Sequence, residues 1–463
     1  MRSRARGIAW ARMSRFSDTI AALATPVGAS AVAVVRVSGP DTARLLDEIF
    51  GVAPLPRRVR RSDYRDRSGA LLDDVLFVFF QGPKSYTAED TLEITSHGNP
   101  FIVQKILEDL FARGCRPANP GEFTQRAFIN GRMELSQAEA VMDLIHAHSD
   151  RALAAANQQL RGALGRRIES MVTRLLGVIA HVEAYIDFPD EDLPVEDQTT
   201  LSGEIEDLLR ETNGLLATGR YGELLRDGIK TVILGAPNVG KSSILNRLVG
   251  RDRALVSPEP GTTRDFIEER IIVGPYCLRL IDTAGLNITP APLEKLGMEK
   301  TMEKAEEADL VMAVTDTESG SPYFPSELRA YLKLGRAIVV VNKTDLAPSA
   351  VPADAFEGIP IVGISATTGS GFEELAAAIT AAADAFRPTV GSDFTAINAR
   401  HAHALTTVRD NLTAARKQIR DAAAAELLAG DLRAALVGLE EIGGKIDNER
   451  MLDRLFATFC IGK

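Results

Sequence analysis

The 463-residue sequence contains few cysteines and no long apolar run. Its cysteines, Cys115, Cys277 and Cys460, lie far apart, and none forms a C-x-x-C pair. This spacing argues against a disulfide framework or a thiolate metal site, and it fits a reducing, cytoplasmic compartment. No apolar stretch approaches the roughly 18 residues that a membrane-spanning helix needs, so the sequence predicts no membrane segment.

The chain also lacks an excess of positive charge, because 53 basic residues face 63 acidic ones and give a net charge of −10. A protein that binds RNA over a broad surface is usually basic, so we expect nucleic acid to meet a local patch or a partner protein. The hydrophobic share of 45% and the charged share of 25% are typical of globular proteins. The length predicts two or three domains.

The first dozen residues contain no acid and four arginines: Arg2, Arg4, Arg6 and Arg12. Such a segment has some likeness to a targeting peptide. No apolar segment follows it, however, and Met13 offers a second start. We therefore interpret residues 1–13 as a disordered extension or the product of a misplaced start codon.

The hydrophobic pattern divides the rest of the chain into three parts. Residues 14–131 mix short apolar runs with turn residues, which predicts an α+β domain. Helical spacing prevails over residues 132–227 and again over residues 389–463. Residues 228–388 alternate strand and helix in the α/β manner. The simplest architecture inserts this α/β domain into a helical domain whose two halves pack together.

Within these parts, individual elements follow from apolar runs between turn residues. A helix is expected over residues 101–112. The expected strands are residues 31–37, 75–80, 91–95, 229–234, 310–314, 337–341 and 361–364, with two more over residues 267–281 about a turn at Gly274–Pro275.

A glycine-rich loop follows the first strand of the inserted domain. Residues 235–242 read Gly-Ala-Pro-Asn-Val-Gly-Lys-Ser, which fits G-x-x-x-x-G-K-S. The glycines let backbone N–H groups turn towards phosphate oxygens, and the following helix adds the positive end of its dipole. We expect Lys241 to reach the β- and γ-phosphates and Ser242 to bind Mg²⁺. A plain glycine turn before a helix is the alternative, and the eight-residue pattern in this context disfavours it.

Two later motifs choose the base. Asp345, in Asn342-Lys343-Thr344-Asp345, can accept hydrogen bonds from N1 and the 2-amino group of guanine, and adenine offers no such pair. Ser365-Ala366 lies one strand later, where a backbone N–H can meet guanine O6. A carboxylate left half-paired would cost several kcal/mol, so the sequence predicts GTP rather than ATP as the nucleotide.

Further motifs are expected to respond to the γ-phosphate. Asp282-Thr283-Ala284-Gly285 ends another expected strand, where Asp282 would hold Mg²⁺ through water and the N–H of Gly285 would contact the γ-phosphate. Thr263 is the expected second Mg²⁺ ligand. The residues expected to contact the nucleotide or its cations are Asn238, Val239, Gly240, Lys241, Ser242, Ser243, Ser257, Pro258, Glu259, Pro260, Gly261, Thr262, Thr263, Asp282, Thr283, Ala284, Gly285, Asn342, Lys343, Asp345, Ser365 and Ala366.

The catalytic groups are less plain. Ras-like enzymes place a glutamine after this glycine to orient the attacking water, and Leu286 cannot do so. Glu294 is a candidate replacement, and a solvated glutamate at a helix start is the alternative. The side-chain oxygen of Asn238 can help to bind a monovalent cation with carbonyls near Ser257 and Glu259, or it can simply brace the loop.

Four stretches go beyond a general GTPase pattern. They are Asp18–Pro26, Glu93–Gly98, Asn119–Phe128 and the terminal Phe459-Cys460-Ile461-Gly462-Lys463. On these stretches the chain resembles the MnmE (TrmE) family of bacterial tRNA-modification GTPases over residues 14–463. The implied fold class is multidomain α/β and α: an N-terminal α+β folate-binding-like domain, a central helical domain and an inserted Ras-like P-loop G domain.

The resemblance implies a homodimer whose G domains pair when GTP and K⁺ bind, with K⁺ in place of an arginine finger. Asn238 matches the family's potassium-binding asparagine, with Ser257, Glu259 and Thr262 beside it. Glu294 matches the residue that orients water.

The resemblance also implies a one-carbon chemistry. Arg36, Glu93, Arg132 and Lys463 match the contacts to 5-formyltetrahydrofolate or a related folate, and such charges suit its glutamate tail and pterin ring. Cys460 matches a terminal cysteine of the family, although a small buried residue is an equal interpretation. With an FAD-dependent partner, MnmG, which also uses NADH, the family adds aminomethyl or carboxymethylaminomethyl groups to C5 of the wobble uridine of certain tRNAs.

The sequence departs from the family pattern in three places: Gly28-Ala29-Ser30-Ala31, Asn287, and His97-Gly98-Asn99-Pro100. The first puts the shape of the folate loop in doubt, and the second any role of residue 287. A rival hypothesis is a ribosome-assembly GTPase that acts as an RNA-binding switch, which would carry a basic module with a G-x-x-G loop. A third is a regulator that uses GTP only to choose its partners.

Overall fold

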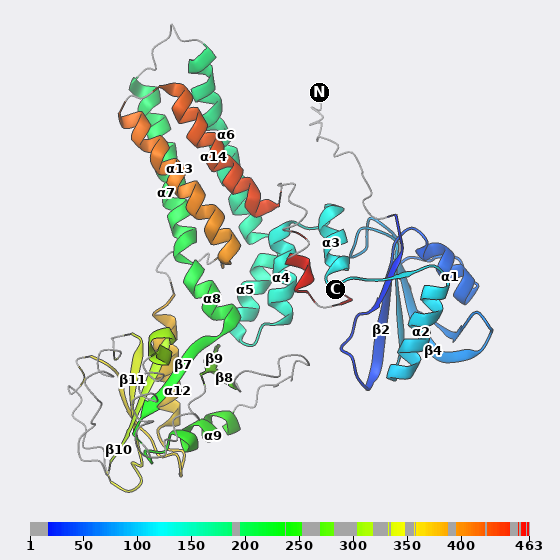
Figure 1. Cartoon of the computed structure of the whole chain (residues 1–463), viewed down its shortest axis with the longest axis horizontal. Coiled ribbons are helices and arrows are strands. Elements are labelled where there is room, and N and C mark those ends of the chain that lie inside the picture. The colour runs from blue at the N-terminus through cyan, green and yellow to red at the C-terminus, as the bar shows by residue number, and fades with distance from the viewer. Residues whose placement is uncertain are drawn as a thin grey trace. The chain divides into compact units, whose positions relative to one another are not determined.

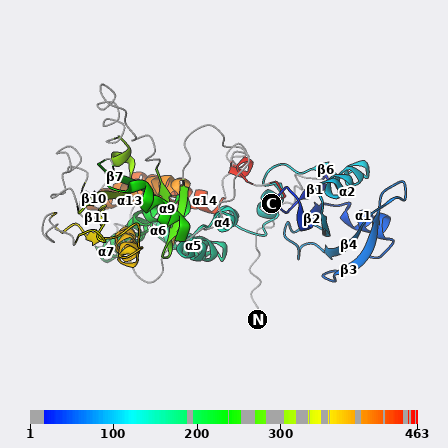
Figure 2. The ribbon, with the colours of Figure 1, turned by 90° about the horizontal axis from the view of Figure 1, so that it is seen from below.

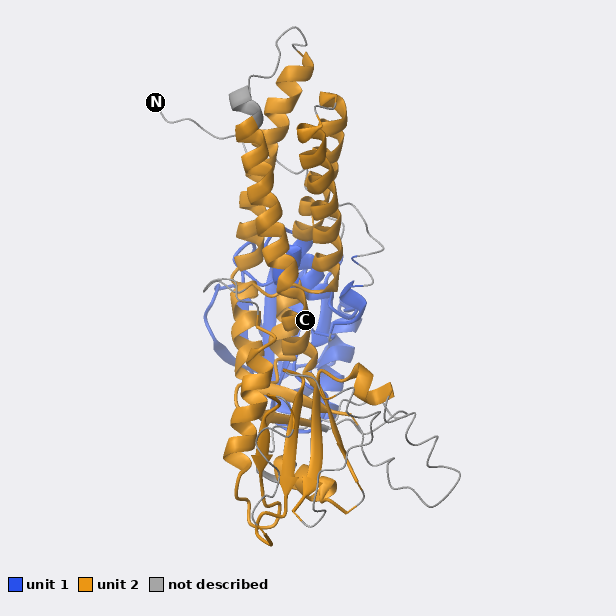
Figure 3. Ribbon diagram, turned by 90° about the vertical axis from the view of Figure 1, so that its left-hand side faces the viewer, with its two compact units in different colours: residues 1–138, 446–463 blue, residues 139–445 orange. Residues whose placement is uncertain are grey.

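The computed structural model divides into two compact units, residues 1–138 with 446–463 and residues 139–445 (Figure 3). No helix among the described residues has the length and apolar character to cross a membrane. The structure describes residues 17–187, 195–236, 238–251, 269–281, 303–317, 332, 335–347, 356, 358–387, 395–421, 424–444, 452, 455–459 and 461–462.

The first unit is built on a mixed sheet of six strands in the order β3-β4-β5-β2-β1-β6. β1 pairs with β6 in parallel, and the other neighbours pair antiparallel. In Figure 2, β3 lies beside β4 at one edge of this sheet. The strands are β1 Ile20–Leu23, β2 Ser30–Ser38, β3 Arg60–Arg65, β4 Leu71–Phe80, β5 Thr91–Gly98 and β6 Arg116–Pro117.

Two helices, α1 (Thr42–Phe50) and α2 (Pro100–Ala112), cover one face of this sheet and form its core. Alternate strand residues such as Val35 and Ile94 point into this core and are fully buried. Because the strand period is two, the intervening residues, including Arg36, occupy the other face. Two further helices follow, α3 (Glu122–Ile129) and α4 (Leu135–Ile145).

The C-terminal segment closes the first unit at two glycines with positive φ. A Cβ on Gly121 (φ 66°) would lie 2.6 Å from the carbonyl oxygen of Phe456. A Cβ on Gly462 (φ 91°) would collide with the carbonyl of Leu23. Both positions therefore require glycine, and three of the sequence stretches that carried the family resemblance pack together here.

The second unit contains long helices that pack around one apolar core (Figure 1). α6 and α7 pack against α13 and α14, although about 180 residues separate α7 from α13 in the sequence. Leu175, Leu208, Leu412 and Leu432 of this core are fully buried. The helices are α5 Asp150–Leu160, α6 Ala163–Asp187, α7 Val195–Ala217, α8 Gly219–Asp227, α13 Ala399–Arg420 and α14 Ala425–Gly443.

An α/β sheet follows α8 in the order β12-β11-β10-β7-β9-β8, parallel except for β8. Parallel strands end at one edge, where ligands of such sheets bind. These layers confirm the predicted fold class. The elements are β7 Ile229–Gly235, α9 Lys241–Arg251, β8 Glu269–Val273, β9 Tyr276–Leu280, β10 Leu310–Asp316, β11 Ala337–Asn342, β12 Ile361–Gly363 and α12 Phe372–Asp384.

Candidate functional site

The phosphate loop joins the buried strand β7 to helix α9, as its motif predicts. Gly235 (φ 153°) and Gly240 (φ 93°) adopt backbone angles that favour glycine. A Cβ on Gly235 would collide with the carbonyl of Val314 on β10, and one on Gly240 with the amide of Asn342. The neighbouring strands therefore leave no room for a side chain at either glycine. Asn238 is left-handed (φ 66°), a region that asparagine tolerates, and it is exposed.

Lys241 lies across this loop. Its Nζ donates hydrogen bonds to the carbonyl oxygens of Gly235 and Ala236, each at 2.8 Å. Partial burial lowers the pKa of Lys241, since little water remains around its ammonium group. Ser242 and Ser243 follow in the first turn of α9 and are exposed. The loop thus offers a fixed positive charge, a helix N-terminus and hydroxyl groups, the chemistry that a phosphate and its Mg²⁺ require.

Asn342 connects the phosphate loop with the loop that contains Ser365 and Ala366, called the base-recognition loop because the sequence predicts that it meets guanine O6. Its Nδ2 donates to the carbonyl of Val239 at 2.8 Å, and its Oδ1 accepts from the N–H of Ala366 at 3.0 Å. The side chain is 3% exposed, so both bonds are shielded from water. The structure therefore brings together three of the predicted motifs through one amide.

The residues after Asn342 turn sharply. Lys343 has φ 63°, and its Nζ lies 2.7 Å from Oδ2 of Asp316 at the end of β10. Its carbonyl accepts a hydrogen bond from the Thr317 hydroxyl at 3.0 Å. Asp345 follows this turn and is exposed. Its carboxylate is therefore accessible to a base, as the motif predicts.

Arg247 of α9 organises the Ser365–Gly371 loop, and the sequence interpretation missed it. Its Nη1 donates to the carbonyls of Ala366 and Thr367, each at 2.9 Å. Its Nη2 donates to the carbonyl of Thr368 at 2.9 Å. A Cβ on Gly369 would collide with this guanidinium. No local pattern marks Arg247, because all these partners are distant in the sequence.

Fourteen predicted site residues lie outside the described part of the chain, so their predicted roles stay predictions. They are Ser257, Pro258, Glu259, Pro260, Gly261, Thr262, Thr263, Asp282, Thr283, Ala284, Gly285, Glu294, Cys460 and Lys463.

Arg36 is the centre of a polar cluster in the first unit. Its Nε donates to Oε1 of Glu93, the opposite residue on β5, at 3.0 Å. Its Nη1 donates to the carbonyl of Gly462 at 3.1 Å. The guanidinium carbon lies 5.3 Å from the ring centroid of Tyr86 and 5.6 Å from that of Phe123. The structure thus brings two predicted folate residues together with the residue before Lys463.

Arg132, the third predicted folate residue, follows α3 and is exposed. Its backbone N–H donates to the carbonyl of Ala127 at 2.8 Å. This bond fixes the start of the segment between α3 and α4.

Arg126 links two of the stretches that carry the family resemblance, Asp18–Pro26 and Asn119–Phe128. The sequence analysis did not predict this role. It is fully buried, and its guanidinium contacts carboxylates of Asp18, Glu89 and Glu122 at 2.8, 3.2 and 2.9 Å. Burial favours a higher pKa for Asp18 and Glu122, but hydrogen bonds and charges from Arg116 and Arg126 outweigh it and lower the pKa of both carboxyl groups. The cluster therefore stays ionised and fixes the loops beside Arg36.

An apolar cavity of about 450 Å³ lies in the first unit between β1, α2 and the C-terminal segment. Leu23, Pro26, Val103, Leu107 and Ile461 line it. Its volume falls in the range of about 300–1,000 Å³ that is common for small-molecule sites. Ile461 precedes Gly462, so the C-terminal segment borders both this cavity and Arg36.

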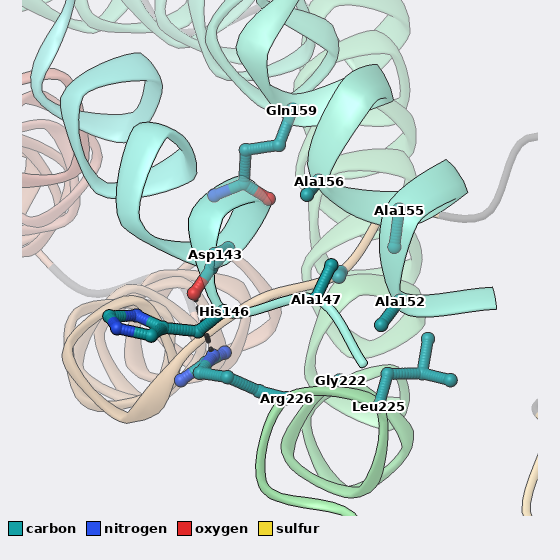
Figure 4. A pocket seen from close by; sticks show the side chains of 11 residues that line it. Asp143, His146, Ala147, Ala152, Ala155, Ala156, Gln159, Gly222, Leu225 and Arg226 are labelled. Carbon is teal, nitrogen blue, oxygen red and sulfur yellow. Dashed lines mark ion pairs between the residues drawn. The ribbon is translucent and has the colours of Figure 1, made fainter. Parts of the chain in front are cut away.

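A smaller pocket lies among the helices of the second unit (Figure 4). Asp143, His146, Gln159 and Arg226 line its polar side, and alanines, Gly222 and Leu225 line the rest. Oδ1 of Asp143 lies 3.2 Å from Nε of Arg226. Burial raises the pKa of Asp143 despite this partner. The pocket is separate from the phosphate loop, and we assign it no ligand.

Comparisons with known proteins match the N-terminal part of the chain and the part after it to two family models. A family model described as MnmE helical domain matches residues 135–460, and one described as GTP-binding protein TrmE N-terminus matches residues 19–132. A tRNA modification GTPase MnmE of Opitutus terrae is 60% identical over 97% of this chain and 100% of its own length. A protein of the same name from Akkermansia muciniphila is 43% identical over 96% of this chain and 99% of its own length. Among solved structures, the G domain of the T. maritima FeoB iron transporter is 28% identical over 34% of this chain and 98% of that chain, with a TM-score of 0.25.

Proposed function

Because the chain belongs to the MnmE (TrmE) family of tRNA modification GTPases, we propose that it couples GTP hydrolysis to modification of the wobble uridine, position 34, of certain tRNAs. Its enzymatic activity is the hydrolysis of GTP. The observation that carries the proposal is the amide of Asn342, which joins the phosphate loop to the base-recognition loop.

Several described residues fit GTP and Mg²⁺. The ammonium of Lys241 lies over loop carbonyls and can turn to the β- and γ-phosphates. The Ser242 hydroxyl is accessible for Mg²⁺, with Thr263 and Asp282 as the further proposed ligands. Asp345 is accessible for guanine, and the N–H of Ala366, held by Asn342, lies on the loop proposed to meet guanine O6.

We extend the proposal to K⁺ and to a homodimer on the family resemblance. Asn238 has a left-handed backbone and an exposed side chain, which leaves its amide oxygen available to a cation. Ser257, Glu259 and Thr262 are the proposed further ligands of K⁺. A cation there would supply the positive charge that an arginine finger supplies in other GTPases, and Glu294 would orient the attacking water.

A one-carbon tetrahydrofolate is the proposed second ligand, at Arg36, Glu93, Arg132 and Lys463. Arg36 is positioned by Glu93 and two aromatic rings, and guanidinium groups suit the carboxylates of a glutamate tail. The apolar cavity that Ile461 lines offers space for a flat ring. Cys460 is proposed as a further participant because it lies two residues before Gly462.

The proposed partner is an FAD-dependent protein, MnmG, with which the chain would act on tRNA in the cytoplasm. The net charge of −10 supports the proposal that the partner helps to bind the tRNA, since an acidic chain has little non-specific attraction for RNA. The modification itself would add aminomethyl or carboxymethylaminomethyl groups at C5 of the uridine.

The deciding experiment is mass analysis of wobble uridines in tRNA from cells that lack the chain. We expect the C5 modification to disappear, to return with the wild-type gene, and to stay absent with Lys241→Ala. Lys105→Ala, which changes a half-exposed lysine on α2 paired with Glu108, is the matched control and should restore the modification. If tRNA from the deletion strain kept its full modification, the proposal would be refuted. Immature ribosomal subunits together with normal tRNA would favour the rival ribosome-assembly function.

A further inference from the structure

Within the part of the chain that the structure describes, positive charge is densest on one short segment. Residues 57–67 contain six arginines and two aspartates, a net charge of +4. Because the whole chain carries −10, all other residues together carry −14. Such a local basic patch on an acidic protein is the pattern expected where a polyanion touches a limited surface.

Residues 60–65 of this segment form β3, the outer strand of the sheet in the first unit, and residues 57–59 lead into it. β3 is the last strand in the strand order, so no strand of the described residues pairs with its outer side. The N–H of Arg57 donates to the carbonyl of Phe79 at 2.8 Å, which fixes the approach to β3 along β4. Arg60 lies opposite Phe77, and Arg61 lies opposite Leu76. Since successive strand residues alternate between faces, Arg60 and Arg61 lie on opposite faces of this edge strand.

Some of these charges already have acidic partners. Arg61 forms an ion pair with Asp74, and Arg65 forms one with Asp63 at 2.9 Å. Nη1 of Arg67 donates to the carbonyl of Ala112 at 2.8 Å.

Four cations of this edge are not neutralised in that way. Within the described part of the chain, Arg57, Arg58, Arg60 and Lys84 form no ion pair with a carboxylate. Nη2 of Arg57 donates to the backbone carbonyl of Lys84 at 3.0 Å, which brings the two residues next to each other. Arg57, Arg58 and Lys84 are exposed, and the guanidinium of Arg60 lies 5.9 Å from the ring centroid of Phe77.

We propose that this basic edge, formed by Arg57, Arg58, Arg60 and Lys84, contacts the phosphate backbone of the tRNA. The inference rests on the proposed function and adds to it the place where this chain touches its RNA. Contacts of this kind position a nucleic acid and carry no sequence information. The edge therefore helps to orient the tRNA and leaves base recognition to other groups.

The chemistry favours a phosphate backbone over an acidic protein. Three of the four cations are arginines, whose planar fork matches phosphate oxygens in pairs. Charged side chains on an edge strand also prevent aggregation between sheets, and that role alone predicts no effect on RNA binding.

The test measures the affinity of the purified full chain for labelled total tRNA at several KCl concentrations. The variant carries Arg57→Gln, Arg58→Gln and Lys84→Gln, and it keeps Arg60 because that side chain packs over Phe77. The matched control carries Arg416→Gln, Lys417→Gln and Arg420→Gln, three exposed cations of α13. Both variants lose the same charge, and GTP hydrolysis in each reports an intact fold.

We expect the variant with Arg57, Arg58 and Lys84 replaced, called the edge variant, to bind tRNA at least about tenfold more weakly at 0.1 M KCl. The slope of the logarithm of its affinity against the logarithm of the salt concentration should be smaller in magnitude by about 2–3. The α13 control should change both quantities little. Equal losses in the two variants, or unchanged binding in the edge variant, would overturn the inference. Unchanged RNA binding combined with loss of a protein partner would also overturn it and indicate an acidic protein surface instead. These outcomes leave the proposed function in place, because that function fails only if tRNA modification in cells does not depend on the chain.

Discussion

At the scale of single residues, Asn342 has the largest consequence for the nucleotide site. Its two hydrogen bonds join backbone groups of Val239 and Ala366, and the absence of a side chain on Gly240 gives it room. A free main-chain carbonyl and a free N–H in this buried position would each cost about 1–3 kcal/mol. The phosphate loop and the base-recognition loop therefore depend on the same side chain.

We expect Asn342→Ala to weaken the binding of both GDP and GTP by about 10–100-fold, because it removes two hydrogen bonds of roughly 1 kcal/mol each. Fluorescent guanine nucleotides titrated into the purified protein measure this change. The control is Asn411→Ala, an exposed amide on α13 that donates to the carbonyl of Thr407 at 2.8 Å. Equal affinities for wild type and Asn342→Ala would show that other contacts hold the loops together.

Residue identities in the nucleotide site could be predicted because each one follows from local chemistry. Lys241, Asn342 and Asp345 occupy motifs of fixed spacing, and the structure places them at the ends of parallel strands. Arg247 could not be predicted, since its partner Ala366 lies 119 residues away. Such a pair depends on the packing of α9 against the loop before α12, which no short pattern encodes.

At the scale of secondary-structure elements, a buried ionic cluster joins α4 to α13 and α14 in the second unit. Nε of Arg400 lies 2.8 Å from Oε1 of Glu139, and its Nη1 donates to the carbonyl of Glu441 at 2.9 Å. Nε2 of His401 lies 2.9 Å from Oε2 of Glu139. The end of α14 is thus held by the start of α13, and both are held by α4.

Burial and charged neighbours determine the protonation of His401. Its Nδ1 accepts from the N–H of Asn398 at 3.3 Å, and its Nε2 lies 2.9 Å from Oε2 of Glu139 and 2.8 Å from Nη2 of Arg400. Burial lowers the pKa of His401 even though Glu139 opposes this shift. Burial acts to raise the pKa of Glu139, but His401 and Arg400 outweigh it and lower that pKa to about 2. The folded cluster therefore contains a neutral histidine and an ionised glutamate.

Both shifts predict a loss of stability in acid. As the pH falls below 6.5, the unfolded chain takes up a proton at residue 401 before the folded chain does, and the glutamate follows between about pH 4.5 and 2. Between pH 7.5 and 5.0 we therefore expect the thermal midpoint of wild type to fall about 2–4 °C further than that of His401→Gln. Circular dichroism of the helices measures the midpoints. His403→Gln alters an exposed histidine of the same helix and should behave like wild type, whereas identical pH dependence in all three proteins would exclude the histidine.

Elements were predictable where apolar runs are long. β10 and β11 begin with continuous apolar runs and are buried throughout, and residues 310–314 and 337–341 were predicted as strands. β3 was missed because its sequence, Arg-Arg-Ser-Asp-Tyr-Arg, buries only Tyr64. An edge strand needs little apolar surface, so its pairing with β4 is what defines it.

At the scale of the whole molecule, the two proposed ligands belong to different units. The nucleotide motifs lie in residues 139–445, and Arg36 and Glu93 lie in the unit formed by residues 1–138 and 446–463. A substitution in one site is therefore expected to leave ligand binding at the other intact. GTP hydrolysis is proposed to need two copies of the chain, because the G domains are proposed to pair when GTP and K⁺ bind. K⁺ then takes the place of an arginine finger.

We expect GTP hydrolysis to be sharply faster in KCl than in NaCl at equal ionic strength, because K⁺ supplies the positive charge near the transferring phosphate. Glu294→Ala should retain GTP binding and lose about 10²–10⁴ in turnover, the contribution of a positioned acid–base group. Steady-state phosphate release measures both effects, and Glu373→Ala, an exposed glutamate in the first turn of α12, serves as the control. Equal rates in the two salts would exclude the cation mechanism, and a fully active Glu294→Ala protein would exclude this residue.

The return of the C-terminal segment to Leu23 and Arg36 also has a consequence for protein synthesis. Residues 17–138 leave the ribosome early, but the chain that completes their packing, Phe456 to Gly462, follows only after residues 139–445 have been made. At about 5–20 residues per second, those 307 residues take roughly 15–60 s to translate. During that interval the nascent N-terminal unit has an uncovered surface at Gly121 and Leu23, and a chaperone has time to bind there before the polypeptide is released.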